Sequence, residues 1–232
     1  MPETHYFSVV SISDSGMKSS YLRQQCSDIY GVHQEIWKLF PSNPDQKRDF
    51  LFREVDRKFP PTFYLLSQRK PEDEKNNWDI KTKEFSPKLK KGNRLFFSLK
   101  ANARITRKEV PSKSGGKNAP KHDIFMDAKE QFRKNNNGKN PLGPTWKNLI
   151  QETGHDWFEK QSTKYGFSLE SIRVESCQQH KILRKGKDIS FNSGFFEGIL
   201  NIQNPEEFTP LLFNGLGSSK SFGCGLMLVR KI

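Results

Sequence analysis

Apolar and polar positions in the N-terminal part of the chain predict a small sheet and one amphipathic helix. Residues 5–13 alternate between apolar and polar side chains, which is typical of a half-buried strand. Residues 28–40 have apolar side chains at helical spacing, with Ser27 or Asp28 as the cap and Pro41 as the stop. Further strands are predicted at residues 50–55, 62–67, 79–86 and 94–107. Up to residue 86, the order of one strand, one helix and three strands is close to a ferredoxin-like or RNA-recognition-motif-like unit.

The rest of the chain predicts a second α/β sandwich of similar size. A long hairpin is predicted from residues 168–183 and 189–202, around the basic tip Arg184-Lys-Gly-Lys187. Helices are predicted at residues 123–135, 145–164 and 206–215, and a last strand at 226–232. The boundary is expected near residues 88–92, which gives domains 1–90 and 91–232.

The charge balance indicates a polyanionic partner. The chain of 232 residues has 39 Lys and Arg against 26 Asp and Glu, a net charge of +13. Its 19 Phe indicate that the chain folds around a core despite this charge. In a folded protein, such a charge favours binding to nucleic acid, and the alternative is a basic protein whose charge serves solubility alone.

The cysteines and the apolar segments exclude several classes of protein. Cys26, Cys177 and Cys224 are isolated, so neither a zinc site nor a disulfide framework is predicted, and a cytoplasmic location fits best. No HxH, HExxH or carboxylate-cluster pattern predicts a metal site, so no metal and no cofactor is expected. No stretch approaches the roughly 18 apolar residues of a membrane span, so no membrane partner is expected.

A glycine-rich and serine-rich segment near the C-terminus is a candidate phosphate site. Gly217, Ser218, Ser219, Lys220 and Ser221 lie between a predicted helix and the last strand. Backbone N–H groups in such a turn can face an anion. The helix-loop-strand order and the missing Gly-Lys-Ser/Thr pattern exclude a P-loop. The alternative is a helix cap at Gly215 or Gly217 followed by a tight turn.

The predicted helix 28–40 carries the best candidate for proton-transfer chemistry. Tyr30, His33 and Trp37 share one flank, beside the apolar stripe, so His33 is expected at the edge of the core. A histidine there can reach a ligand and transfer protons near neutral pH. The alternative is a boundary histidine that packs against Trp37.

Further basic residues are candidates for contacts with nucleic-acid phosphates. They lie on the predicted strand 94–107, in the lysine-rich segment 110–140 and around the hairpin tip: Lys100, Arg104, Arg107, Lys113, Lys117, Lys181, Arg184, Lys185 and Lys187. A basic two-stranded ribbon can enter a nucleic-acid groove, and the alternative is a solvated hairpin tip.

Several segments, in order along the chain, together resemble the CasE endoribonucleases, the CRISPR repeat-processing subunits of type I-E Cascade. These are His33-Gln-Glu-Ile-Trp-Lys-Leu-Phe-Pro41, Arg48-Asp-Phe-Leu-Phe-Arg53, Phe97-Ser-Leu-Lys-Ala-Asn102, Ser193-Gly-Phe-Phe-Glu-Gly-Ile-Leu200 and Gly215-Leu-Gly-Ser-Ser-Lys220-Ser-Phe-Gly-Cys-Gly-Leu226. The segment 110–142 matches least well.

The resemblance implies an α+β protein of two tandem ferredoxin-like domains with antiparallel sheets. It implies metal-independent cleavage of pre-crRNA at the base of each repeat stem-loop, leaving a 2′,3′-cyclic phosphate and a 5′-hydroxyl. The partners would be the crRNA 3′ hairpin and other Cascade subunits. The catalytic residues would be His33 and Tyr30. Lys38 occupies the position of a further basic residue and is a candidate for RNA binding, although helical geometry puts it opposite His33.

Two other classes of function stay open at this stage. One is a non-catalytic subunit of Cascade that binds the RNA hairpin through the same fold. The other is a DNA-binding regulator, although no helix-turn-helix stands out in the sequence.

Overall fold

The computed structural model describes residues 4–40, 46–55, 59–106, 121–184 and 187–232. Its contacts divide the chain into two compact units. The first consists of Met1–Lys88, Ile182–Ile189 and Thr209–Leu226, and the second of Leu89–Lys181, Ser190–Phe208 and Met227–Ile232. The division into sequence-continuous domains 1–90 and 91–232 stays a prediction, since the contacts place the glycine-rich segment in the first unit.

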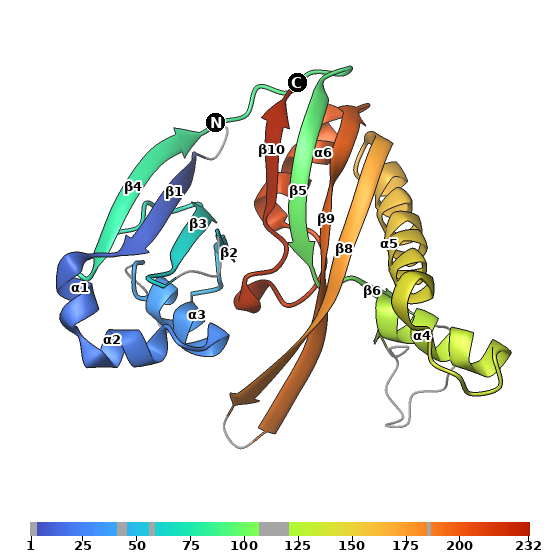
Figure 1. The fold of residues 1–232 in the computed structure, drawn as a ribbon. Coiled ribbons are helices and arrows are strands. Elements are labelled where there is room, and N and C mark those ends of the chain that lie inside the picture. The colour runs from blue at the N-terminus through green and yellow to red at the C-terminus, as the bar shows by residue number, and fades with distance from the viewer. Residues whose placement is uncertain (1–3, 41–45, 56–58, 107–120, 185–186) are drawn as a thin grey trace. The chain divides into compact units, whose positions relative to one another are not determined.

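The first unit contains a sheet with the ferredoxin-like strand order (Figure 1). Its strands are β1 (His5–Ile12), β2 (Phe50–Glu54), β3 (Thr62–Ser67) and β4 (Trp78–Phe85), in the order β2-β3-β1-β4. All neighbouring pairs are antiparallel, and Val9 of β1 lies opposite Tyr64 on one side and Lys81 on the other. The predicted strands of this region are therefore confirmed.

The helix that carries His33 is α3 (Ile29–Trp37), and a side-chain cap fixes its start. The carboxylate of Asp28 accepts hydrogen bonds from the backbone N–H groups of Tyr30 and Gly31 at 2.8 and 2.9 Å. Such a cap satisfies N–H groups that the first turn leaves without a partner. The helix is shorter than the predicted 28–40, because it ends at Trp37 with Lys38 as its C-cap.

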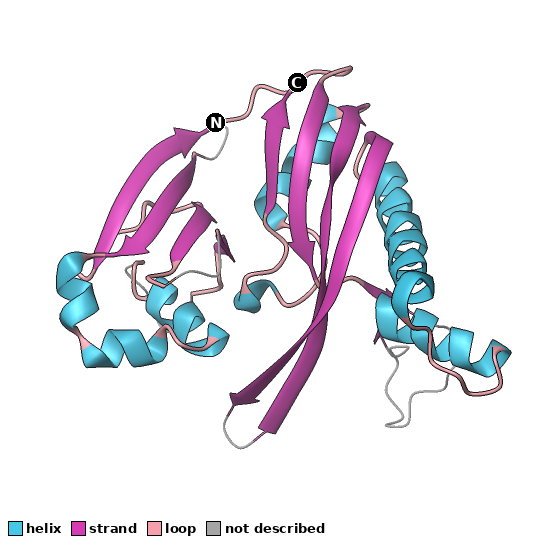
Figure 2. Cartoon of the chain, viewed as in Figure 1, coloured by secondary structure: helices cyan, strands magenta, loops and turns pink. Residues whose placement is uncertain are grey.

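Two short helices between β1 and α3 were not predicted. They are α1 (Asp14–Lys18) and α2 (Ser20–Gln25), which precede α3 below the sheet in the view of Figure 2. Each begins at a serine whose hydroxyl accepts a backbone N–H bond, Ser13 for α1 and Ser19 for α2. Helices this short complete too few turns for an apolar period to show in the sequence.

Aromatic and branched side chains form the core between α3 and the sheet. Val32 and Ile36 of the helix belong to one buried cluster with Phe50, Phe52 and Phe63 of the strands. At the start of the helix, Gly31 approaches the preceding helix so closely that a Cβ atom would lie 2.1 Å from the carbonyl oxygen of Gln25. A side chain at this position would therefore push α3 away from α2.

The second unit has the same strand order, with helices in both crossover connections. Its sheet runs β10-β5-β9-β8, and a small ribbon pairs β6 with β7. The elements from residue 94 onward are β5 (Arg94–Ala101), β6 (Arg104–Thr106), β7 (Lys121–Asp123), α4 (Ile124–Asn135), α5 (Gly143–Lys164), β8 (Phe167–Arg184), β9 (Lys187–Ile202), α6 (Pro205–Asn214) and β10 (Met227–Lys231). The tip of the β8–β9 hairpin and the part of α6 from Thr209 onward count with the first unit. The predicted helices, hairpin and last strand are confirmed.

The prediction of one continuous strand at residues 94–107 was wrong. The strand breaks after Ala101, where the buried side chain of Asn102 donates a hydrogen bond to the backbone oxygen of Asn192 at 2.6 Å. Beyond the break, β6 pairs with β7 instead of continuing along the sheet. The apolar alternation continues across this break, so the sequence period alone cannot reveal it.

Helix α5 packs on the sheet of the second unit through stacked aromatic rings. The Phe158 ring lies 4.7 Å from that of Phe97 on β5 and 6.1 Å from that of Phe196 on β9. Among the described residues, no helix is both long and apolar enough to cross a membrane. The chain is thus an α+β protein of two tandem ferredoxin-like domains with antiparallel sheets, as predicted.

Candidate functional site

His33 lies at the edge of the core of the first unit, as predicted. Its half-buried imidazole ring is 6.0 Å from the Phe50 ring and 6.1 Å from the Phe52 ring, between centroids. The imidazole and the Trp37 ring are nearly perpendicular, with their centroids 5.8 Å apart. His33 is thus partly exposed to solvent and also packs against Trp37, as the two interpretations of the sequence expected. The surrounding aromatic rings restrict how the imidazole can turn.

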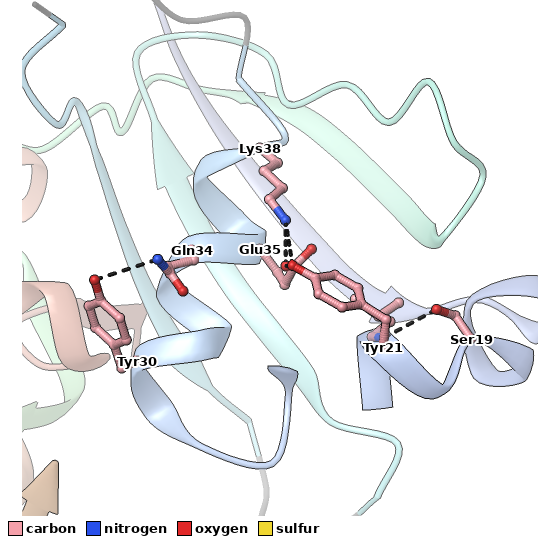
Figure 3. Close-up of polar contacts among 7 residues, drawn as sticks. Ser19, Tyr21, Tyr30, Gln34, Glu35 and Lys38 are labelled. Atoms are coloured by element: carbon pink, nitrogen blue, oxygen red, sulfur yellow. Dashed lines mark hydrogen bonds and ion pairs between the residues drawn. The ribbon is translucent and has the colours of Figure 1, made fainter. Parts of the chain in front are cut away.

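Tyr30 lies one helical turn before His33 and is also half-buried. Its hydroxyl accepts a hydrogen bond of 3.5 Å from the side-chain amide of Gln34 (Figure 3). In Figure 3, Tyr30 and Gln34 point to one side of α3, whereas Glu35 and Lys38 point to the other. The helix therefore presents Tyr30 away from the Lys38 side.

The structure does not bring Lys38 together with His33. Its ammonium group donates hydrogen bonds to Glu35 Oε1 at 2.6 Å and to Tyr21 Oη at 3.1 Å. Burial alone would lower the pKa of Lys38, but the hydrogen bonds to Glu35 and Tyr21 outweigh it and raise the pKa. The charge of Lys38 is thus paired with the carboxylate of Glu35, on the face that the sequence geometry indicated.

The glycine-rich segment forms a tight turn that packs on α3 and β2 of the same unit. Its centre is the 3-10 helix η1 (Lys220–Phe222), between Ser219 at φ 55° and Gly223 at φ 70°. A Cβ atom on Gly223 would lie 3.4 Å from Cε2 of Phe52, the ring on which His33 stacks. One aromatic ring of β2 therefore contacts both the candidate histidine and the candidate phosphate loop.

The first glycine of this segment also acts as a helix cap, which was the alternative interpretation of the sequence. Helix α6 ends at Asn214, and Gly215 follows with φ 71° while its N–H donates to the oxygen of Leu211 at 2.9 Å. A Cβ atom on Gly215 would lie 2.8 Å from the Leu51 side chain. The first glycine thus ends the helix on β2, and the turn with Lys220 follows it.

Arg48 is a neighbour of this turn that the sequence analysis did not single out as a site residue. Its Nη1 atom donates a hydrogen bond of 2.8 Å to the Ser221 hydroxyl, 173 positions away in the chain. The adjacent Lys220 donates from Nζ to the backbone oxygen of Asn214 at 2.6 Å. No local pattern could have revealed this pairing, because it depends on how the loop folds back onto β2.

The electrostatics around Arg48 and Lys220 are unusual for basic side chains. Burial lowers the pKa of Arg48, and burial together with the charge of Arg48 lowers the pKa of Lys220. The nearby carboxylate of Asp49 is already held by Arg69, with two hydrogen bonds of 2.6 and 2.9 Å. Two cations therefore lie close together, and the adjacent carboxylate is directed to another partner.

The remaining predicted RNA contacts are less well located. Lys100 is half-buried, Lys181 is exposed, and Arg104 donates to the backbone oxygen of Lys121 at 2.6 Å. Gly217, Ser218, Ser219 and Ser221 are half-buried in the turn. Outside the described part of the chain lie Arg107, Lys113, Lys117 and Lys185, and the side chains of Arg184 and Lys187.

The described residues contain no group of three or more His, Cys, Asp or Glu side chains placed to hold a metal ion. His155 is exposed on α5, where its Nδ1 lies 3.4 Å from Asp156. His180 shares a hydrogen bond of 2.8 Å with the Ser193 hydroxyl in the hairpin. These histidines belong to the second unit, whereas His33 belongs to the first.

The fold is that of a tandem ferredoxin-like protein. In its first unit, the turn with Lys220 packs on the helix that carries His33. The family model described as "CRISPR associated protein" matches residues 5–231. The chain therefore belongs to this family of CRISPR-associated proteins, and the resemblance drawn from the sequence motifs is confirmed.

Individual relatives agree with this assignment. The CRISPR system Cascade subunit CasE of Escherichia coli K12 is 29% identical over 202 residues, which cover 86% of this chain and 90% of the relative. The structure of the CRISPR endoribonuclease Cse3 bound to a 19 nt RNA has a TM-score of 0.71 at 20% identity, covering 98% of this chain and 99% of that one. The crystal structure of Cas6e from Escherichia coli K-12 has a TM-score of 0.65 at 23% identity, covering 98% and 100%.

Proposed function

We propose that this protein is a CRISPR repeat endoribonuclease. It cleaves pre-crRNA at the base of the repeat stem-loop, without a metal ion, and remains on the 3′ hairpin of the crRNA as a subunit of Cascade in the cytoplasm. The observation that carries the proposal is the arrangement around Phe52, where His33 and the loop of Lys220 meet on one strand. The names of the relatives CasE and Cse3 support the RNA substrate and the assembly.

The reaction we propose uses the 2′-hydroxyl of the RNA as its nucleophile. The 2′-oxygen bonds to phosphorus, the bond to the 5′-oxygen breaks, and a 2′,3′-cyclic phosphate and a 5′-hydroxyl result. One proton leaves the 2′-hydroxyl and one reaches the departing 5′-oxygen. His33 and Tyr30 share these general base and general acid roles, since both are half-buried on the same flank of α3.

Donors at fixed positions are needed to hold the backbone phosphates of the RNA near the reacting bond. Lys220 and the turn from Gly217 to Ser221 supply them, because the packing of Gly223 on Phe52 anchors the turn beside α3. The basic residues of the second unit and of the hairpin, including Lys100, Arg104 and Lys181, contact the RNA stem. Proteins read stems of this kind mainly through shape, phosphates and 2′-hydroxyl groups.

A cleavage assay tests the proposal directly. The repeat RNA of the source organism is incubated in EDTA with the wild type, with His33→Ala and with His155→Ala, which removes an exposed histidine of the second unit. We expect cleavage to a cyclic phosphate by the wild type and by His155→Ala, and tight binding without cleavage by His33→Ala. Cleavage that requires a divalent metal would refute the mechanism.

The second candidate is a non-catalytic subunit that binds the RNA hairpin. The packing of His33 among Trp37, Phe50 and Phe52 favours it, because a structural histidine would be held in the same way. Under this alternative, even the wild type binds the hairpin and leaves it intact. A DNA-binding regulator would instead bind duplex DNA as tightly as the RNA hairpin.

A further inference from the structure

Arg48 and Lys220 form a pair of like charges that the protein holds together with separate anchors. The guanidinium of Arg48 is fixed by the Ser221 hydroxyl at 2.8 Å, and the ammonium of Lys220 by the backbone oxygen of Asn214 at 2.6 Å. Both anchors are neutral oxygens. They orient the two cations without cancelling either charge.

The described part of the chain offers no carboxylate to either cation. The ion pairs in it involve other residues, and Asp49, the acidic neighbour of Arg48, is bound by both nitrogens of the Arg69 fork. Both Arg48 and Lys220 are half-buried. Partly buried like charges destabilise a folded protein unless an anion lies between them or beside them.

A polar pocket borders Arg48 and the residue that anchors Lys220, whereas Lys220 itself is not among its lining residues. Arg48 and Asn214 line a pocket of about 240 Å³, together with Gln68 and Phe213. All of these residues belong to the first unit. An anion in this pocket would therefore lie against Arg48 and beside the residue that anchors Lys220, and Asp49, which also lines the pocket, is bound by Arg69.

The position of the turn indicates which anion the pair would bind. The turn η1 lies against α3 and β2, and Gly223, directly after it, packs on the ring that supports His33. A phosphate held by Lys220 and Arg48 is consequently close to a bond on which His33 acts. Arginine binds phosphate oxygens with two donors in a fixed fork, whereas lysine acts as a point charge.

We propose that Arg48 and Lys220 together form one binding site for a single RNA phosphodiester, which lies within one nucleotide of the scissile bond. Arg48 is thus a phosphate-binding residue of the site, and the two side chains act as a unit. The position of this phosphate rests on the proposed function, because it is defined relative to the bond that is cleaved. The existence of the site can be tested by binding alone.

The test uses an uncleavable RNA, so that it does not depend on catalysis. The repeat hairpin carries a 2′-deoxynucleotide at the cleavage position, and neutral methylphosphonates replace the phosphates around it one at a time. Dissociation constants are measured for the wild type, Arg48→Gln and Lys220→Gln. The control is Lys81→Gln, which removes the same charge from an exposed position of β4 in the same unit.

We expect Arg48→Gln to weaken binding on the order of 10-fold to 100-fold, which is typical of a lost charge-assisted hydrogen bond. Lys81→Gln should change binding about 2-fold or less, as a screened surface charge does. One methylphosphonate, within one nucleotide of the cleavage position, should weaken the wild type as much as Arg48→Gln does. The same methylphosphonate should have little further effect on Arg48→Gln or Lys220→Gln.

Three results would overturn the proposal. The first is that the effects of the protein variants and of the methylphosphonates on binding add at every phosphate. The second is that Arg48→Gln binds as tightly as Lys81→Gln, and the third is that Arg48→Gln is coupled to a phosphate far along the stem. Thermal unfolding checks that each variant folds. If Arg48→Gln unfolds at the assay temperature, the test uses Lys220→Gln alone, and the measurement is again whether its effect on binding adds to that of each methylphosphonate. If the proposed function is wrong, the wild type will leave unmodified repeat RNA uncleaved. This result does not affect the binding test.

Discussion

The imidazole of His33 and the ring of Phe52 stack with their centroids 6.1 Å apart and their planes within 17°. Phe52 is almost fully buried, so it presents a rigid surface to the imidazole. Gly223 approaches the same ring from the C-terminal loop. A single buried side chain of β2 therefore connects the candidate proton-transfer residue with the candidate phosphate loop.

Substitution of Gly223 by alanine should show whether backbone strain beside the turn affects RNA cleavage. Gly223 and Gly138 both have positive φ, at 70° and 79°, but only Gly223 faces a neighbour, Phe52, within 4 Å. Each alanine should destabilise the fold by about 1 kcal/mol in thermal unfolding. Only Gly223→Ala should also slow RNA cleavage, because the strained φ then lies directly after the turn that holds Lys220, while the added Cβ makes an ordinary contact with Phe52 at 3.4 Å. Equal cleavage by the two variants would contradict the role of the turn.

Tyr30→Phe should reduce the rate of cleavage about 10-fold to 100-fold, with little change in RNA affinity. The hydroxyl is removed, while the ring and its place on α3 remain. Tyr21→Phe is the matched control, because it removes a hydroxyl that bonds Glu35 and Lys38 on the other side of α3. Single-turnover kinetics with saturating enzyme measure this difference. A larger loss of rate with Tyr21→Phe would place the chemistry on the wrong side of the helix.

Asp28→Ala should lower the free energy of unfolding by roughly 1 kcal/mol, because it removes the cap of α3. The carboxylate holds the N–H groups of Tyr30 and Gly31. Asp28→Ser keeps a capping oxygen and should restore most of the lost stability. Urea unfolding of the two variants provides the measurement. An Asp28→Ala protein as stable as the wild type would mean that the cap is not needed to start the helix.

RNA binding should weaken at alkaline pH through Lys220. Its pKa in the folded protein is lowered from the ordinary value of 10.5, first by burial and then by the charge of Arg48. The unfolded chain therefore holds more protons, and this group makes the protein more stable as pH rises from the lowered value to 10.5. A bound phosphate favours the charged ammonium, so RNA affinity should fall as pH rises through the lowered value.

The variant Lys220→Arg isolates this contribution, since arginine stays charged throughout the range. Affinity for the uncleavable hairpin is measured between neutral and alkaline pH at constant ionic strength. The wild type should lose affinity with pH more steeply than Lys220→Arg. Parallel curves would show that Lys220 does not titrate in the site.

RNA affinity should also fall steeply with salt concentration, because phosphate contacts release counterions. Each lost contact should reduce the slope of log K against log salt by about 0.7 to 0.9. Lys220→Gln is therefore expected to have a shallower slope than Lys81→Gln, whose exposed side chain serves as the reference. A flat salt response of the wild type would contradict a phosphate-dominated interface.

Most of the local structure around the candidate site could be predicted from the sequence pattern. The helical spacing and the cap predicted α3 and placed Tyr30 and His33 on its flank, and the glycines predicted the turn before β10. These features depend on backbone periods, caps and positive φ, which neighbouring residues determine. The motif resemblance added the family and the tandem ferredoxin-like fold, which composition and spacing had supported only for the first half.

The contacts between distant residues could be seen only in the folded chain. It joined Arg48 to Ser221, stacked His33 on Phe52 and paired Lys38 with Glu35 and Tyr21. It also ended β5 at Ala101, where the buried Asn102 turns its amide to Asn192. Such contacts follow from strand order, register and the packing of the whole core, which a local pattern of apolar and polar residues does not encode.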